Sequence, residues 1–138
     1  EAKEELDIYI AAVRDIMQRT LAAFAELDAG KAFTIEPLED RIDELNKIFT
    51  SNHIERLKQG ACSVDHGFIL TEVYNVLERV ADHCSNIGIY IIQYKHDDSL
   101  RVHDYTHSLD KTKSNYEKLY RDYVSLYPIK YGKFSNNQ

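Results

Sequence analysis

Residues 71–92, TEVYNVLERVADHCSNIGIYII, indicate most clearly how this chain folds. Apolar side chains recur along this stretch at steps of three and four residues, which is the period of an amphipathic α-helix. The stripe that they form consists of Val73, Leu77, Val80, Cys84, Ile87 and Ile91. We therefore predict a long helix that begins after Ser63, a residue type that caps helix N-termini, and continues to about Tyr94.

Two further helices are predicted before this one. The first covers about residues 4–27, and Gly30 is expected to close it in a left-handed conformation. The second covers about residues 35–59, with Thr34 as its cap and Pro37 in its first turn. Their apolar stripes are Leu6, Ile10, Val13, Met17, Leu21 and Phe24 in the first helix, and Leu38, Ile42, Leu45 and Phe49 in the second.

The rest of the chain carries weaker signals. Residues 96–113 are polar and show no clear period, so we predict a linker there, either a loop or a short irregular helix. A fourth helix is predicted from Ser114, where Glu117 completes a capping box, to Pro128. Its tyrosines are expected to keep their hydroxyls in water, and residues 135–138 are expected to be a disordered tail.

Three long helices joined by short turns pack most simply as antiparallel neighbours. The predicted fold is therefore all-α. Residues 1–95 form an antiparallel three-helix bundle, and residues 114–138 add a C-terminal helix and tail to the same domain.

The composition restricts the class of protein. Of the 138 residues, 29% are charged and 43% are hydrophobic, and the formal net charge is −6. No clustered basic face is visible, which argues against nucleic acid as a partner. The sequence also contains no run of 18 apolar residues, the length needed to span a membrane. Cys62 and Cys84 do not form a CxxC pair and no secretory signal is visible, so we expect a reducing compartment. Because the sequence starts at Glu1 rather than Met, we expect it to be a fragment or a processed product.

Two pairs of acidic residues share a four-residue spacing: Glu39 with Asp43, and Glu78 with Asp82. This spacing places both carboxylates of a pair on one face of a helix. If residues 60–63 form the turn of a helical hairpin, the two pairs lie within roughly one helical turn of each other along the bundle. Four such carboxylates repel one another unless a cation or basic partners compensate them.

Two interpretations of this acidic cluster remain open. Its oxygen atoms suit hard or intermediate cations, among which Fe, Mg, Mn, Ca and Zn are all candidates. On a helical wheel, however, the four side chains lie roughly 100° from their apolar stripes. They can therefore also be ordinary surface acids that form salt bridges with Arg41 and Arg79.

The histidines offer a second, weaker pattern. His103 and His107 are four residues apart and flank Asp104, a spacing that occurs in zinc sites. The glutamate that follows the first histidine in metalloproteases is absent, so solvent-exposed histidines are the simpler interpretation, and the roles of His96, His103 and His107 stay open. Neither a Glu-x-x-His motif nor a glycine-rich phosphate loop occurs, and we expect no enzymatic activity.

Residues 78–87, ERVADHCSNI, and residues 37–45, PLEDRIDEL, resemble the PhoU-like domain found as the cytosolic tail of bacterial Na/Pi cotransporters. The likeness extends over about residues 3–94. It implies a three-helix bundle, of which full PhoU proteins carry two copies, located on the cytoplasmic side of the cell membrane. It also implies a regulatory role in phosphate uptake. The family's E/D-x-x-x-D motifs bind metal clusters, and by position this role falls to Glu39, Asp43, Glu78 and Asp82.

The resemblance also implies partners. These are the transmembrane part of the same transporter and phosphate-signalling proteins, and a homo-oligomer is compatible with it. One alternative is a free-standing PhoU-like adaptor that docks on a transporter and a sensor kinase. Another is a carboxylate-bridged metalloenzyme, against which the lack of Glu-x-x-His counts.

Overall fold

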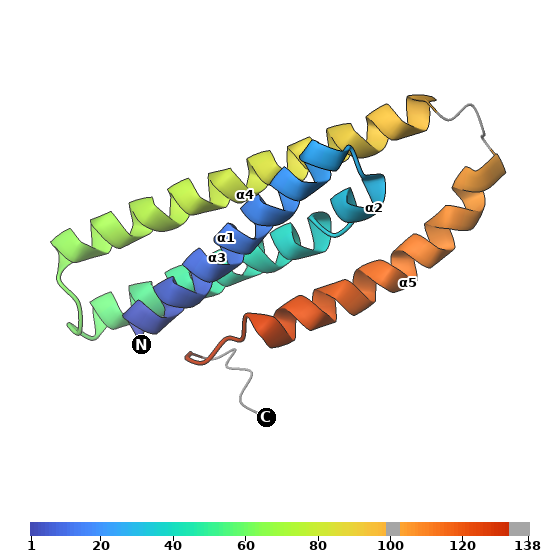
Figure 1. The fold of residues 1–138 in the computed structure, drawn as a ribbon. Helices are drawn as coiled ribbons and strands as arrows, with labels where there is room; N and C mark the ends of the chain where they lie inside the picture. Colours follow the sequence, from blue (N-terminus) through green and yellow to red (C-terminus); the bar gives the residue numbers. More distant parts are fainter. Residues whose placement is uncertain (99–102, 133–138) are drawn as a thin grey trace.

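The computed structural model describes the backbone of residues 1–98 and 103–132 and the side chains of residues 1–95 and 113–132. The elements are α1 (Ala2–Glu26), α2 (Ala29–Ala32), α3 (Glu36–Lys58), α4 (Val64–Asp98) and α5 (His103–Leu126), and no strand occurs in these ranges. The long helices alternate in direction, so that α1 and α4 run one way and α3 and α5 the other (Figure 1). The predicted all-α class, a three-helix bundle with an added C-terminal helix, is confirmed.

The turn after α1 differs from the prediction. Leu27, not Gly30, takes the left-handed conformation, with φ of 47°. Gly30 lies inside the short helix α2, which Asp28 caps by accepting a hydrogen bond of 3.0 Å from the backbone N–H of Lys31. Because Asp28 is already the N-cap of α2, the left-handed residue that ends α1 has to be Leu27.

The two caps predicted for the following helices have different outcomes. Thr34 does not cap α3: its hydroxyl donates to the Lys31 carbonyl at 2.7 Å, and the N-cap position falls on Ile35. Pro37 does lie in the first turn of α3, as predicted. Ser63 also precedes α4 as predicted, and its hydroxyl accepts from the backbone N–H of His66 at 3.4 Å.

The core lies between α1, α3 and α4. An aromatic cluster fills the part of the core near the start of α1. There the Tyr9 ring packs edge-to-face on Tyr74, with centroids 5.4 Å apart, and on Phe49 at 6.3 Å. Aliphatic side chains continue the core toward α2, and the fully buried ones include Ile16, Ile35, Leu38, Ile42 and Leu45. Burial of these side chains is the main favourable contribution to folding.

The apolar stripe predicted for α1 is only partly the buried one. Met17, Leu21 and Phe24 are 51%, 69% and 60% exposed. The face that packs inward lies beside them and consists of Tyr9, Ala12, Val13, Ile16, Thr20 and Ala23. Small residues on this face let α1 approach its neighbours closely, so the larger side chains are turned outward. On α4 likewise, Ile87 is 38% exposed, whereas Tyr74, absent from the predicted stripe, is fully buried.

The linker predicted at residues 96–113 is mostly helical. The helix α4 continues to Asp98 and α5 already begins at His103, so Ser114 lies inside a helix rather than at its start. Neither glycine nor proline occurs between Gly88 and Pro128, so residues 96–98 and 103–113 contain neither of the two strongest helix breakers. The end of α5 at Leu126, before Pro128, agrees with the prediction. Residues 135–138, the predicted tail, lie outside the described residues.

Three tyrosines predicted to keep their hydroxyls in water instead attach the C-terminal helix to the bundle. Tyr120 of α5 donates to Glu44 at 2.6 Å and Tyr123 to the Thr34 carbonyl at 3.1 Å, and Tyr127, just after α5, donates to Asp15 at 3.0 Å. The buried Arg41 completes the attachment. Its Nη2 and Nε donate to the Tyr127 carbonyl at 2.5 and 3.1 Å, and its Nη1 donates to Glu44 at 2.5 Å.

After α5 the chain turns back along the start of α1. The Tyr131 hydroxyl donates to the Glu4 carboxylate, and Asn52 Nδ2 bridges the Tyr131 carbonyl at 3.0 Å and Glu5 at 2.8 Å. The buried Glu5 also pairs with Arg56 at 2.6 Å. Both ends of the described chain therefore lie at one end of the bundle (Figure 1). None of the helices in residues 1–98 and 103–132 is long and apolar enough to cross a membrane.

Candidate functional site: an acidic groove between α3 and α4

A hydrogen bond between α3 and α4 fixes the relative height of the predicted acidic residues. Ser85 donates to Glu36 across the two helices at 2.6 Å. Because α3 and α4 are antiparallel, three residues forward on one helix corresponds to three residues back on the other. Glu39 is therefore level with Asp82, and Asp43 is level with Glu78. We call the surface between these four carboxylates the acidic groove.

The carboxylates of the acidic groove repel one another. The pKa of Glu39 is raised to about 7, first by its partial burial and then by negative charge nearby. The carboxylates responsible, in order of decreasing effect, are those of Glu36, Asp40, Asp82 and Asp43. The pKa of Asp40 is raised for the same reasons. The groove thus concentrates negative charge that its own side chains compensate poorly.

The arginines proposed as partners of these acids lie elsewhere. Arg41 is 1% exposed and binds Tyr127 and Glu44. Arg79 is exposed and forms no ion pair with any of the described residues. Of the four groove carboxylates only Asp43 has a basic partner in the described part of the chain, the exposed Lys47 at 2.6 Å. The salt bridges to Arg41 and Arg79 that would make the cluster ordinary surface are therefore not formed.

A tyrosine that the sequence analysis did not single out lies beneath the groove. Tyr9 is 0% exposed, and its hydroxyl has no hydrogen-bond partner among the described residues. Burial raises the pKa of Tyr9, and the carboxylates of Glu78, Asp43 and Asp82 raise it further, which places the hydroxyl near the groove. An unpaired buried hydroxyl is costly, so this atom is a ready donor or oxygen ligand. No sequence motif marks it, because a tyrosine on a core face is ordinary.

The donor set suits a hard cation, but its present geometry is open. In residues 1–95 and 113–132, no three His, Cys, Asp or Glu side chains converge closely enough to hold a metal ion. The four carboxylates come from two facing helices, so side-chain rotation would have to draw them together around an ion. Oxygen ligands at this spacing fit Mg, Mn, Ca or Fe better than a thiol-preferring metal.

The other residues considered from sequence do not join this groove. The side chains of His96, His103 and His107 lie outside the described residues, although the backbone at 103 and 107 is helical. Cys84 is buried beside Thr20, and burial raises the pKa of its thiol, which makes it unreactive. Cys62 is half-buried in the turn between α3 and α4.

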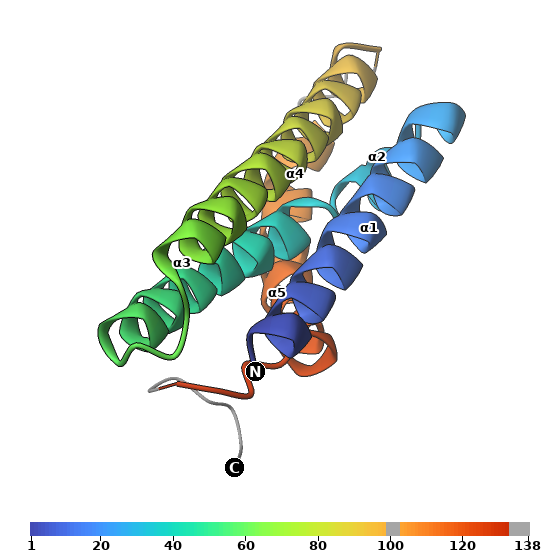
Figure 2. The ribbon, with the colours of Figure 1, turned by 90° about the vertical axis from the view of Figure 1, so that its left-hand side faces the viewer.

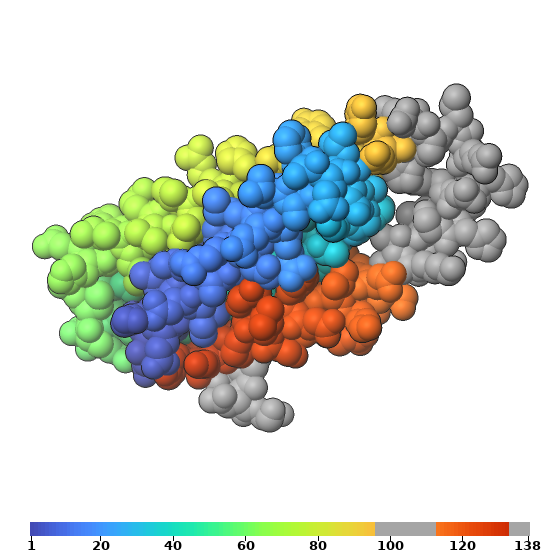
Figure 3. All heavy atoms as spheres, viewed as in Figure 1, coloured from blue at the N-terminus to red at the C-terminus, as the bar shows by residue number. Residues whose placement is uncertain are grey.

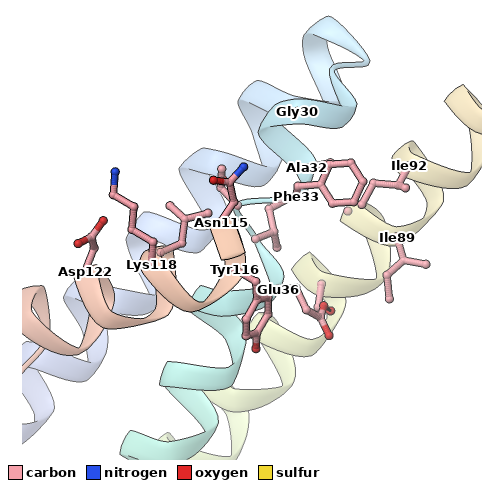
Figure 4. Close-up of a pocket in the computed structure, with 15 residues that line it drawn as sticks. Gly30, Ala32, Phe33, Glu36, Ile89, Ile92, Asn115, Tyr116, Lys118 and Asp122 are labelled. Carbon is pink, nitrogen blue, oxygen red and sulfur yellow. Dashed lines mark hydrogen bonds between the residues drawn. The ribbon is translucent and has the colours of Figure 1, made fainter. Parts of the chain in front are cut away.

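A pocket of about 620 Å³ opens next to the groove, between the α2–α3 turn, α4 and α5 (Figure 4). Its walls are mainly apolar, from Phe33, Ile35, Ile89, Ile92 and Leu119, and the Glu36–Ser85 pair forms part of its lining. The Glu36–Ser85 hydrogen bond, about one helical turn from Glu39 and Asp82, therefore lies between the pocket and the acidic groove.

Comparison with known proteins identifies the class. Residues 8–91 match the PhoU domain, and the chain therefore belongs to the PhoU domain family. All four groove carboxylates and Tyr9 fall within the matched residues.

One relative is the phosphate-specific transport system accessory protein PhoU homolog 1 of Thermotoga maritima. It is 30% identical over 87 residues, which cover 63% of this chain and 38% of that protein. The chain thus spans well under half the length of this relative. No solved structure matches the chain.

Proposed function

We propose that this chain is a regulatory module of a phosphate transport system. We further propose that a cation bound in the acidic groove shapes the surface through which the module contacts its partners. Membership of the PhoU domain family and the name of the Thermotoga relative support the role in phosphate transport. The observation that carries the cation site is the level pairing of Glu39 with Asp82 and of Asp43 with Glu78. No catalytic step is part of this proposal.

Electrostatics favours a cation in the groove. A divalent ion would offset the repulsion that raises the pKa of Glu39, and it would return that side chain to its charged form. The Tyr9 hydroxyl, which has no partner within the described part of the chain, would gain one from a carboxylate or from a water molecule on the ion. Fe, Mn, Mg, Ca and Zn are the ions to test, because carboxylate oxygens serve all of them.

The cation site can be tested by metal analysis and calorimetry on the purified chain. We expect Mn²⁺ or anaerobic Fe²⁺ to bind the wild type, and an Asp43→Asn/Asp82→Asn variant to bind about 100-fold more weakly, since it loses one carboxylate from each pair. An Asp65→Asn/Asp122→Asn variant removes the same amount of charge elsewhere and should bind like the wild type. Equal, negligible uptake by all three proteins would refute the site.

We further propose that the module lies on the cytoplasmic side of the membrane, as the tail of a Na/Pi cotransporter. The ERVADHCSNI segment, residues 78–87, supports this, because it resembles that group of proteins. The partner would be the transmembrane part of the same polypeptide. The coding sequence upstream of Glu1 distinguishes the tail from a free-standing adaptor: several hydrophobic segments support the tail, and a start codon supports the adaptor.

Phosphate uptake in cells tests the regulatory role itself. The Asp43→Asn/Asp82→Asn change, introduced into the intact gene, should alter the dependence of uptake on external phosphate without lowering protein abundance. The Asp65→Asn/Asp122→Asn change should leave uptake as in the wild type. If both variants transport and respond like the wild type, the groove has no part in regulation.

A further inference from the structure

An apolar surface runs along the seam between α1 and α4. We call it the apolar strip and define it by its exposed side chains: Met17, Leu21, Phe24, Val76, Ile87, Tyr90 and Tyr94. They follow one another at helical steps of three and four on α1, and the α4 members belong to one run that also contains the half-buried Val80. Figure 3 shows α1 (blue) and α4 (green to yellow) meeting on the face turned toward the viewer.

The two helices advance together along this seam. Tyr9 packs on Tyr74, and eleven residues later Thr20 lies beside Cys84, ten residues after Tyr74. Leu21 on α1 is therefore nearly level with Ile87 on α4, midway along the strip. Beyond this level the upper ends of the helices separate, with α2 between them (Figure 2).

The side chains of the strip together expose more apolar surface than the largest patch of an ordinary monomer. Its seven side chains are 38–70% exposed. At roughly 200 Å² for a large, fully exposed apolar side chain, they present on the order of 800 Å². Monomeric proteins rarely expose patches above ~600 Å², whereas each partner in a standard protein interface contributes about 800 Å². The strip thus has the area that a stable dimer needs from each subunit.

Its composition is also that of an interface. The strip contains Met, Phe and two Tyr, types enriched at protein interfaces, and no Asp, Glu or Lys. On α4, His83 lies in the same run, between Val80 and Ile87, and it is the one basic residue type in that run. The exposed Arg14 and Arg79 border the strip on its solvent side, where a polar rim is expected. A lipid surface is a poorer match, because membrane-surface helices need many flanking cations and this chain has a net charge of −6.

From the area, composition and geometry of the strip, we infer that a second copy of this chain covers it. If a twofold axis crosses the seam, α1 of each copy would pack against α4 of the other copy. The four helices would then form one layer between the two bundles. Leu21 and Ile87, midway along the strip, would lie next to the axis and close to the same residues of the other copy. This inference is independent of the acidic groove, which faces the other side of α4.

Sedimentation and light scattering on the purified chain test the pairing. We expect twice the monomer mass of 16.0 kDa, with a dissociation constant below about 10 μM for an interface of this area. Leu21→Glu and Tyr90→Glu should each raise that constant about 100-fold, because they place a charge inside the strip. Phe68→Glu is the matched control: Phe68 is 71% exposed but lies on α4 outside the strip, and its variant should dimerise normally. Circular dichroism should show unchanged helix content in all three.

Cross-linking tests the position of the axis. In a Cys62→Ser background, Leu21→Cys should form a disulfide-linked dimer on mild oxidation, and Phe68→Cys should not. A monomeric mass at about 200 μM, or a dimer unaffected by Leu21→Glu, would overturn the inference. A monomer that binds phosphatidylcholine–phosphatidylglycerol vesicles, and loses this binding in Leu21→Glu, would overturn it in favour of a lipid surface.

Discussion

The attachment of α5 through Arg41 leads to a quantitative prediction. Arg41 is 1% exposed and donates three hydrogen bonds, two to the Tyr127 carbonyl and one to Glu44. In Arg41→Met the aliphatic volume is kept, but the carbonyl of Tyr127 loses its charged donor. Hydrogen bonds to a charged group, plus the cost of a buried unpaired carbonyl, amount to about 3 kcal/mol after allowing for the arginine's own desolvation. For 138 residues this corresponds to a Tm lower by roughly 10 °C.

Urea unfolding followed by circular dichroism measures this loss. Arg121→Met is the matched control, because Arg121 is exposed on α5, and it should cost less than about 0.5 kcal/mol. Hydrogen exchange adds a local readout: amides of α5 near Tyr123 and Tyr127 should lose protection in Arg41→Met before those of α3 do. A loss below about 1 kcal/mol, or one equal to that of Arg121→Met, would show that α5 is held by other contacts.

Three further predictions concern Glu39 in the acidic groove, Tyr9 beneath it, and the buried Glu5–Arg56 ion pair. Because the pKa of Glu39 is raised from 4.5 to about 7, the folded chain keeps a proton there that the unfolded chain has lost. Stability should therefore fall as pH rises from about 4.5 to 7, by on the order of 1 kcal/mol for this partly exposed group, and Glu39→Gln should remove that slope in thermal melts without metal. Tyr9→Phe removes a buried hydroxyl that bonds to none of the described residues and should leave stability unchanged or raise it by about 1 kcal/mol; a large loss would reveal an unrecognised partner. Glu5→Ala strands Arg56 at the buried ion pair and should cost about 3 kcal/mol in urea unfolding, whereas a cost no greater than that of Glu1→Ala would contradict the burial.

Periodicity alone located α3 and α4 well and misplaced the buried face of α1. A stripe shows that one side of a helix is apolar, and α1 has two neighbouring apolar sides. The larger side chains Met17, Leu21 and Phe24 form the more obvious stripe, but Ala12 and Ala23 form the side that allows close helix packing. Which side is buried depends on neighbours far away in sequence, and the sequence pattern of α1 does not contain them.

The same limit applied to α5 and to the groove. Residues 103–113 lack an apolar stripe, yet they are helical because nothing interrupts them and α5 is held at its far end by Tyr123, Tyr127 and Arg41. The level of the two acidic pairs followed from counting residues on either side of the turn, since a helical hairpin has few registers. Tyr9 could not be found that way, because it belongs to a third helix, α1, and packs on Tyr74 and Phe49 from there.

The contact of Tyr131 with Glu4 and Asn52 has a consequence for engineering and mechanics. It brings residue 132 beside the first turn of α1, so a short Gly-Ser linker could join Gly132 to Glu1 and new ends could be opened at Gly60, in the exposed turn between α3 and α4. Such a circular permutant would keep every helix in place. Conversely, tension applied between residues 1 and 132 would load this small cluster of polar contacts first, and the aromatic core only after these contacts had broken.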